Sequence, residues 1–318
     1  MKKIFIALAA LATLAACSKE AAIETPQGDA IAFGDAFVDH STKAIYETAN
    51  NLQGFTVWGN VANVALYGET GATVTRGDKA LGAAWTCSTT RYWTPSSTFN
   101  FAAIANGTGT DCVNGLPTKI SYTLNGADPA DLVYGTATAT TDASCAPSGN
   151  VVNGTGIVSF TLEHLLARVK VSFENQIEGG DYTYAISNVT LTTWDKGVYT
   201  IAPAEGQTPW ARTGEATVAL PYTAINSLAY STTPTSAGAQ VVIPGAPITL
   251  GFAYELKLKV GEGFETIYTN TVSKTVETTL VKGHSYSLNV QLKAGGKIDF
   301  TVADGGLGVW TDEGTTTI

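Results

Sequence analysis

Strict alternation of apolar and polar residues is the feature that most constrains the fold of this chain. Tyr254–Val260 has an apolar residue at every second position, and so do Ser285–Leu292 and Arg168–Phe173. A period of two places the apolar side chains of a strand on one face and the polar ones on the other. Half-buried strands of this kind are typical of antiparallel sheets that pack into β-sandwiches.

The remaining sequence agrees with an all-β fold. Short extended runs are separated by turn dipeptides at Asn106-Gly107, Asn125-Gly126 and Asn153-Gly154. Charged residues make up only 14% of the chain, and Gly, Thr and Ser are abundant. We expect a single short helical turn, at Glu163–Ala167.

The first seventeen residues predict a bacterial lipoprotein. Lys2 and Lys3 precede an apolar stretch that is too short to span a bilayer, and Leu14-Ala15-Ala16-Cys17 places small residues directly before a cysteine. In this arrangement, signal peptidase cleaves before Cys17, and acyl chains on Cys17 attach the protein to the outer membrane. Two or three acyl chains hold a protein stably at a membrane, which a single chain does not.

The domain organisation follows from these features. We expect a signal peptide at residues 1–16, a polar tether at 17–29, and two tandem β-sandwich (transthyretin-like) domains at 30–163 and 164–318. The mature chain of roughly 300 residues is long enough for two hydrophobic cores. The boundary lies where the helical turn gives way to the alternating run Arg168–Phe173.

Charge and motifs exclude several classes of function. The formal net charge of −9, with no basic stripe, disfavours nucleic acid as a partner. His40, His164 and His284 stand far apart, and we expect His164 to pack or hydrogen-bond at the domain junction. Asp299 and Asp304 are explained by strand alternation and a turn. We therefore predict no catalytic residue, no metal site and no cofactor.

Three cysteines follow Cys17 in the sequence. In an oxidising compartment we expect one pair to form a disulfide, with Cys112 and Cys145 preferred because both lie in loops rich in small polar residues. Three free thiols, including Cys87, are the open alternative.

After the lipobox come Thr42-Lys43-Ala44, Phe55-Thr56-Val57-Trp58, the run from Phe160 to Val171, and Ile298-Asp299-Phe300-Thr301-Val302 followed by Trp310. Together these segments resemble the fimbrillin-like (type V pilin, Mfa-like) lipoproteins of Bacteroidales. The resemblance covers nearly the whole mature chain. It depends on the order and spacing of the segments rather than on one specific motif.

The resemblance implies a mechanism of assembly. A protease removes the first strand, here Ala30–Val38 with Ile31, Phe33 and Val38, by cleavage between Lys43 and Ala44. A C-terminal strand of another fimbrial subunit, here within Ile298–Ile318 with Ile298, Phe300 and Val302, then takes its place. The best-known members are cleaved after arginine, so a protease of broader basic specificity, or no cleavage, remains open.

Two further interpretations start from single motifs. Arg76-Gly77-Asp78 is the tripeptide that integrins recognise on exposed loops, although Gly with Asp is also ordinary turn chemistry. Six tryptophans, with Tyr92-Trp93 on a loop, offer stacking surfaces for sugars, although core filling is their usual role. The sequence thus favours a structural or adhesive fimbrial subunit with a possible host or bacterial surface ligand. The alternative is a surface lipoprotein that binds glycans without polymerising.

Overall fold

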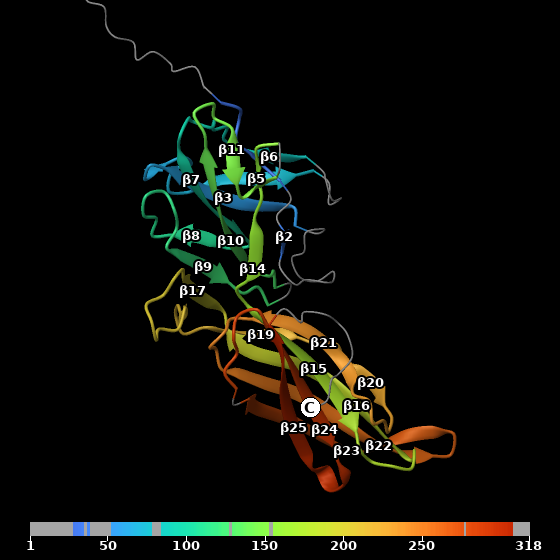
Figure 1. Ribbon diagram of the computed structural model, residues 1–318. Coiled ribbons are helices and arrows are strands. Elements are labelled where there is room, and N and C mark those ends of the chain that lie inside the picture. Colours follow the sequence, from blue (N-terminus) through green and yellow to red (C-terminus); the bar gives the residue numbers. More distant parts are fainter. Residues whose placement is uncertain are drawn as a thin grey trace, which may run out of the picture.

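The structure is a computed structural model that describes residues 28–34, 37–38, 52–77, 84–126, 129–152, 155–276 and 278–307. Within these residues the chain forms 25 strands and one short 3₁₀ turn, η1 (Ala294–Gly296). The predicted all-β class is confirmed. The molecule is elongated, with the first half of the chain at one end and the second half at the other (Figure 1). No helix in the described ranges is long and apolar enough to cross a membrane.

A nine-stranded sheet forms the centre of the first half. Its main path runs β2-β14-β10-β7-β3-β5-β6, with β11 beside β10 and β4 beside β3. The alternating sequence of β10 produces a regular alternation of inward and outward side chains. The strands of this sheet are β2 (Phe37–Val38), β3 (Gly54–Val61), β4 (Val64–Ala65), β5 (Ala72–Arg76), β6 (Trp85–Cys87), β7 (Thr98–Ala105), β10 (Val133–Thr141), β11 (Pro147–Gly149) and β14 (Thr161–His164).

A small sheet packs against one face of this large sheet. It has the order β1-β13-β12, and its strands are β1 (Ala32–Phe33), β12 (Val151–Val152) and β13 (Ile157–Val158). Between the two sheets lies an apolar cluster that is rich in aromatic rings, including Phe33, Phe55, Phe101 and Phe160. We call it the N-terminal cluster.

A four-stranded sheet connects the two halves of the chain. Its order is β18-β17-β9-β8, which pairs strands before and after the predicted boundary at residues 163 and 164. The strands are β8 (Thr108–Thr110), β9 (Lys119–Thr123), β17 (Lys196–Thr200) and β18 (Trp210–Arg212). Trp58 and Ile104 of the large sheet belong to the same apolar cluster as Ile120 and Tyr122 of β9. The predicted division into domains therefore stays a prediction, and one sheet crosses it.

Two sheets enclose the core of the second half (Figure 1). The four-stranded sheet β21-β15-β24-β25 faces the five-stranded sheet β19-β16-β22-β23, in which β20 lies beside β16. The predicted alternation of Val169, Val171 and Phe173 is confirmed, because all three side chains point into this core. The strands are β15 (Ala167–Asn175), β16 (Tyr182–Trp194), β19 (Thr217–Pro221), β20 (Ile225–Leu228), β21 (Thr235–Val242), β22 (Ile248–Val260), β23 (Gly263–Val276), β24 (His284–Leu292) and β25 (Ile298–Leu307).

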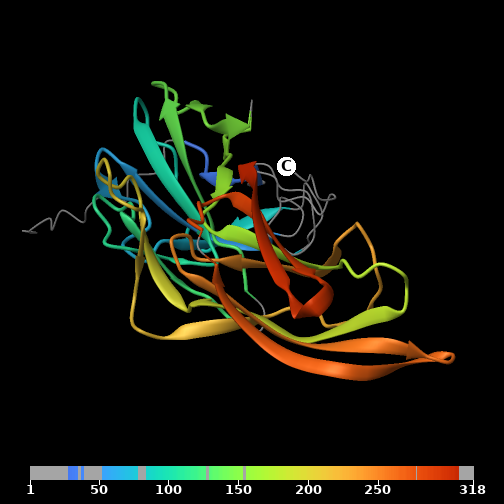
Figure 2. The ribbon, with the colours of Figure 1, turned by 90° about the horizontal axis from the view of Figure 1, so that it is seen from below.

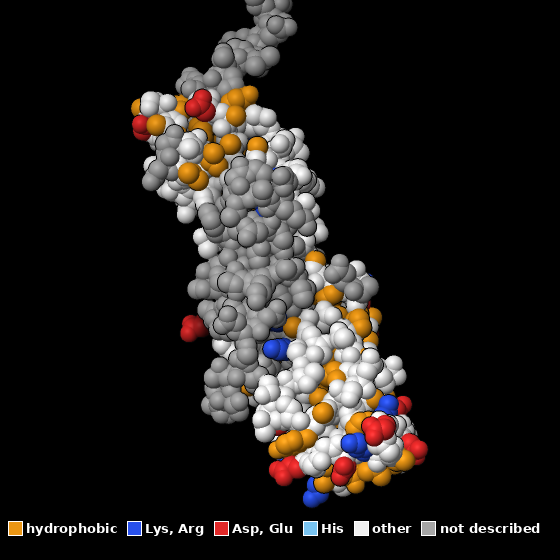
Figure 3. Space-filling model, turned by 90° about the vertical axis from the view of Figure 1, so that its right-hand side faces the viewer, with side chains coloured by type: hydrophobic (Ala, Val, Ile, Leu, Met, Phe, Trp, Pro, Cys, Tyr) orange, Lys and Arg blue, Asp and Glu red, His pale blue; other side chains and the backbone are white. Residues whose placement is uncertain are grey.

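The hairpin of β22 and β23 extends past its neighbours (Figure 2). Tyr254 is buried, whereas Val260 near the turn is 47% exposed, because the second sheet does not reach that far. Phe264 and Tyr268 on β23 are also largely exposed. Charged side chains of both signs gather with hydrophobic ones at the lower end of the molecule in Figure 3, and Lys257 and Glu255 form an ion pair on this hairpin.

The helical turn predicted at Glu163–Ala167 is wrong. Glu163 and His164 end β14, and Ala167 begins β15. The backbone groups between them bond to distant partners instead of closing a helical turn, since Leu165 N–H donates to Leu132 O (2.9 Å) and Leu166 O accepts from Gly283 N–H (2.7 Å). The side chains of Leu165 and Leu166 are fully buried, so tertiary contacts override the local preference of this sequence.

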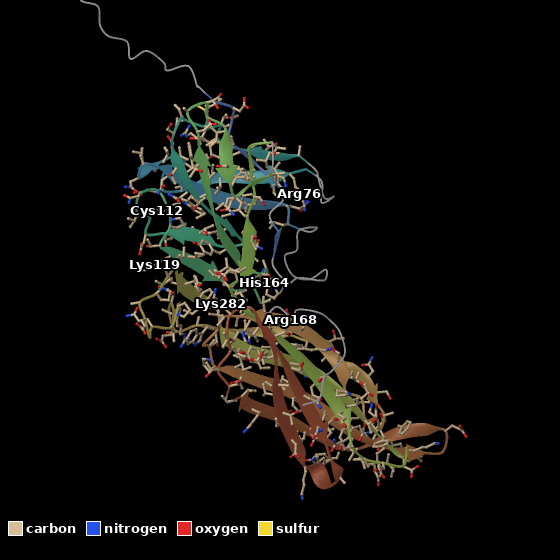
Figure 4. The ribbon with its side chains drawn as sticks, in the orientation of Figure 1. Arg76, Cys112, Lys119, His164, Arg168 and Lys282 are labelled. Atoms are coloured by element: carbon tan, nitrogen blue, oxygen red, sulfur yellow. The ribbon has the colours of Figure 1, made fainter. Side chains whose placement is uncertain are left out.

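Polar side chains also connect the two halves at this junction (Figure 4). The imidazole of His164 forms a buried hydrogen bond with the carboxyl group of Asp131, so the hydrogen bond predicted for His164 is confirmed. Lys282 contacts Glu163 at 2.8 Å. Burial lowers the pKa of Lys282, but the hydrogen bonds and electrostatic interactions with Glu163 and Tyr199 together outweigh burial, and the pKa is raised.

We predict that Trp210→Phe lowers the free energy of unfolding by about 1–3 kcal/mol. The Trp210 indole N–H donates a buried hydrogen bond to Leu165 O (3.0 Å), and its ring contacts those of Tyr122 and Tyr199. Phenylalanine retains a ring but leaves the carbonyl of Leu165 without this donor. The measurement is equilibrium denaturation in urea. Trp194→Phe is the matched control, because Trp194 is only half-buried, and equal losses for the two variants would contradict the assignment.

Candidate functional site

The first described strand is inserted between two other segments of backbone. On one side β1 pairs in parallel with β13, where Ala32 lies opposite Ile157 and Phe33 opposite Val158. Gly34 N–H extends this pairing by donating to Val158 O at 3.0 Å. Within its three-stranded sheet β1 is the marginal strand, so any bonds on its other side come from outside that sheet.

The residues just before β1, 29–31, pair on the other side with the loop segment Arg91–Trp93. Ile31 N–H donates to Arg91 O (2.7 Å), and Trp93 N–H donates to Asp29 O (3.1 Å). Ala30 and Tyr92 form an antiparallel bridge between these bonds. We call the space between β13 and residues 91–93 the strand slot. Removing β1 would leave unpaired backbone groups on both of its sides.

The predicted strand Ala30–Val38 is confirmed in part, since it forms two short strands in different sheets. After Gly34 the chain continues to β2, which pairs in parallel with β14 at the margin of the large sheet. Gly34 allows the close approach, because a Cβ there would lie 2.7 Å from Ile157 Cγ2. The backbone of Val38 takes part in β2, as the prediction requires, while its side chain lies outside the described set.

Two side chains of β1 fill an apolar pocket beneath the slot. Ile31 and Phe33 are each 4% exposed, as their predicted role requires, and Ala32 between them faces outward. Four aromatic rings surround Phe33, with ring centroids 5.8–6.4 Å from its own. They are Phe55, Tyr67, Phe101 and Phe160. Burial raises the pKa of Tyr67, so its ring stays neutral at physiological pH.

The predicted donor segment forms the last described strand. β25 pairs with β24 alone and lies at the margin of its sheet. Ile298 and Phe300 are half-buried against the second core, and Val302 is 39% exposed. This strand is therefore held by one neighbour and an incompletely covered apolar face. Cys17, Lys43 and Ala44, which complete the predicted set, lie outside the described residues.

The predicted disulfide is not formed in the structure, where Cys87, Cys112 and Cys145 are free thiols. Cys145 belongs to the N-terminal cluster, whereas Cys112 packs against the other core and its thiol donates to Glu69 O (3.3 Å). Burial raises the pKa of Cys112, and the charges of Glu69 and Asp111 add to this effect. The two side chains sit in separate clusters, a separation that loop composition alone does not reveal.

The integrin interpretation fails at Arg76. This residue ends β5 and is 5% exposed, with its Nε donating to Leu52 O (2.8 Å) and its guanidinium 4.9 Å from the ring of Trp85. Recognition of the tripeptide requires an exposed arginine, and Asp78 lies outside the described residues. Cleavage after Arg76 would also cut within the large sheet.

Three of the five tryptophans in the described residues fill the core rather than presenting a surface for sugars. Trp58, Trp93 and Trp210 are at most 5% exposed, so Trp93 does not form a stacking platform with its neighbour Tyr92. Trp85 and Trp194 are half-buried, and Trp310 lies outside the described set. A cavity of about 510 Å³ near β3 and β9 is lined largely by hydroxyl, amide and backbone groups, and its one aromatic residue, Phe55, is 3% exposed.

The titratable side chains of the last two strands pair with groups of opposite chemical character. His284 contacts Asp304 at 3.0 Å across β24 and β25, and Asp299 forms an ion pair with Lys293. Asp299 and Asp304 therefore each face a basic group rather than one another. No group of three or more His, Cys, Asp or Glu side chains in the described ranges is arranged to hold a metal ion.

We predict that Phe33→Ala destabilises the full chain by about 3–5 kcal/mol, because the substitution empties a pocket lined by four rings. Phe264→Ala is the matched control, since Phe264 is 46% exposed on β23, and we expect it to cost less than about 1 kcal/mol. Denaturation in urea measures both changes. A loss at Phe33 no larger than that at Phe264 would show that β1 adds little to the fold.

Comparison with known proteins agrees with this architecture. A solved fimbrial protein from Bacteroides vulgatus has the same fold, with a TM-score of 0.53 and 18% identity over 86% of this chain and 98% of that one. Two proteins from Porphyromonas gingivalis are also similar over most of their length. The fimbrial anchor protein Mfa2 has 10% identity over 89% of this chain and 98% of its own, with a TM-score of 0.38. The tip fimbrial protein Mfa3 with C-terminal truncation has 9% identity over 86% and 98%, with a TM-score of 0.39.

The search of curated proteins finds no match. The sequence model of the fimbrillin-like family matches residues 41–304, which is most of the chain. The resemblance seen in the sequence is thereby confirmed. This chain belongs to the fimbrillin-like family.

Proposed function

We propose that this protein is a structural or adhesive subunit of a cell-surface fimbria and that it assembles by strand exchange. The observation that carries the proposal is the position of β1. It lies between β13 and residues 91–93, and its side chains fill an aromatic pocket. Membership of the fimbrillin-like family supports the fimbrial role.

Cleavage after Lys43 would remove β1 and β2 together. The strand slot would then expose unpaired N–H and C=O groups beside the open pocket of Phe33, and β14 would lose one of its two partners. Such groups favour addition of an extended segment, which restores the hydrogen bonds and fills the pocket with alternate side chains. The pilin needs no catalytic residue for this step.

The incoming segment is the C-terminal strand of another fimbrial subunit. In this chain the corresponding strand is β25, together with the residues that follow it to Ile318. β25 leaves at modest cost because it has one neighbour and its apolar side chains are only partly covered. The released strand gains a second hydrogen-bonded edge in the slot of the next subunit.

The lipobox places this assembly at the cell surface. An acylated Cys17 holds the precursor in the outer membrane until the first strand is removed. A subunit that escapes cleavage stays attached to the membrane lipid and acts as an anchor. The same sequence therefore accommodates a polymerising form and a membrane-bound form.

Replacing the lysine at the predicted cleavage site tests the processing step. We expect Lys43→Gln to leave surface protein that begins at the acylated Cys17 instead of Ala44, and to abolish polymers that resist sodium dodecyl sulfate. N-terminal sequencing and gel electrophoresis measure the two effects. Lys119→Gln is the control, because Lys119 is a partly exposed lysine in β9. Normal polymers from Lys43→Gln would show that cleavage occurs elsewhere or is not required.

A charge on the donor strand tests the exchange itself. We expect Phe300→Asp to fold but to accumulate as monomer, because a carboxylate cannot enter the aromatic pocket without a large desolvation cost. Phe264→Asp introduces the same change on the exposed strand β23, and we expect it to polymerise normally. Circular dichroism verifies folding, and negative-stain microscopy measures polymer. Equal polymerisation of both variants would rule out Phe300 as a donor residue.

A further inference from the structure

The longest strand in the described residues lies at the margin of its sheet. β23 is 14 residues long and pairs with β22 alone, and its hairpin projects from the body of the molecule in Figure 2. From Gly263 to Thr275 every residue is exposed except the half-buried Val272. Marginal strands usually avoid further pairing because they are short or carry proline or lysine. β23 has no proline, and its stretch from Thr266 to Ser273 has no charged residue.

The two charged residues of β23 are Glu265 and Lys274. Both are exposed, and neither forms an ion pair with another residue in the described part of the chain. They are separated by about 30 Å of extended strand, so they do not neutralise one another within a single copy. A partner that pairs with the free edge of β23 and carries the opposite order of charges would satisfy both.

A β-bulge places these two charges on the same face of the sheet. Lys274 lies opposite Leu250 and Glu265 lies opposite Leu258. The two leucines are an even number of positions apart on β22, which puts them on one face. Ile267 is the extra residue at the register shift, and without this bulge Glu265 and Lys274 would point to opposite faces.

We infer that a second copy of this chain pairs with the free edge of β23, antiparallel to it, about a twofold axis at Asn270. Glu265 lies five positions before Asn270, one of which is taken up by the bulge, and Lys274 lies four positions after it. The two charges are thus equally far from the axis along the strand. Glu265 of each copy therefore lies opposite Lys274 of the other, and symmetry gives two such ion pairs.

The same register matches the apolar side chains of the two copies. Tyr268 and Val272 are each two positions from Asn270, so Tyr268 of one copy lies opposite Val272 of the other. Tyr268 is 49% exposed, and its ring contacts only the near face of Tyr254, with centroids 6.1 Å apart. Aromatic and β-branched residues that face each other across strands stabilise a sheet. The charges and the apolar residues of β23 therefore select one register for a second copy.

A contact of this symmetry joins two molecules and then closes. The same strand is used on both sides, so the contact does not extend into a chain of subunits. It leaves β1 and β25 unused, and these are the strands that the proposed strand exchange requires. The contact therefore joins two subunits, or two fimbriae that contain them, side by side.

Three single cysteine variants of the full-length chain test the axis. Tyr268→Cys, Asn270→Cys and Val272→Cys are each produced in the native host and oxidised gently, and non-reducing gels measure covalent dimers. Only the residue on the axis lies opposite itself, at a distance that a disulfide spans. We expect dimers from Asn270→Cys alone, and dimers from Tyr268→Cys and Val272→Cys only when these two are co-expressed. The unmodified chain, with its free thiols at Cys87, Cys112 and Cys145, is the control and should give none.

Each other pattern of crosslinks contradicts the inference. Dimers from Tyr268→Cys alone or Val272→Cys alone would place the axis two residues away. Dimers from all three variants expressed singly would show parallel pairing in register. No crosslink from Asn270→Cys or from the co-expressed pair, in protein that circular dichroism shows to be folded, would show that β23 does not pair with a second copy.

Reversing the charges tests whether they select the partner. In the Asn270→Cys chain, we expect either Glu265→Lys or Lys274→Glu to slow the initial rate of dimer formation about tenfold, because each change replaces two attractive contacts with two repulsive ones. The two changes together restore opposite charges, and we expect them to restore the rate. Rates unaffected by the single changes, or a double variant as slow as the single ones, would overturn the pairing of Glu265 with Lys274.

Discussion

The hydrogen bonding of residues 29–34 to two separate segments is the interaction on which the rest of the structure depends. A strand between β13 and residues 91–93 satisfies the backbone groups of both neighbours, and Phe33 closes the aromatic cluster beneath it. Because buried backbone groups must be paired, the slot has to be filled by some extended segment. The chain supplies that segment itself from its own N-terminus.

Other contacts join the half of the chain that contains the strand slot to the other half. The sheet β18-β17-β9-β8 and the core around Trp58 and Tyr122 join the two halves of the chain. The Asp131–His164 pair and the bond from Trp210 to Leu165 add polar connections at the junction. These contacts do not include β1, so the junction keeps its own hydrogen bonds and packing whichever segment occupies the slot.

Exposed sheet margins are a hazard for most proteins, and charges on them usually discourage unwanted pairing. β25 carries Asp299 on its outward side, whereas Ile298 and Phe300 face the core. Asp304 lies on that same inward face, near the end of the strand, and contacts His284. The outward carboxylate of β25 is hydrated in the monomer, and its apolar side chains are still suited to an apolar pocket. The same alternation that forms the strands of the second half also gives the last strand an apolar face, which suits its transfer to another subunit.

The sequence by itself determined the all-β class and the inward faces of β15 and β24, because a period of two depends only on the local geometry of a strand. Only the tertiary structure decided what depends on distant partners. Leu165 and Leu166 bond to residues far away in the sequence instead of forming a helical turn, and Arg76 is buried against Trp85. The pairing of β9 with β17 and the two-sided setting of β1 likewise follow from contacts between segments far apart in the sequence, which local patterns do not encode.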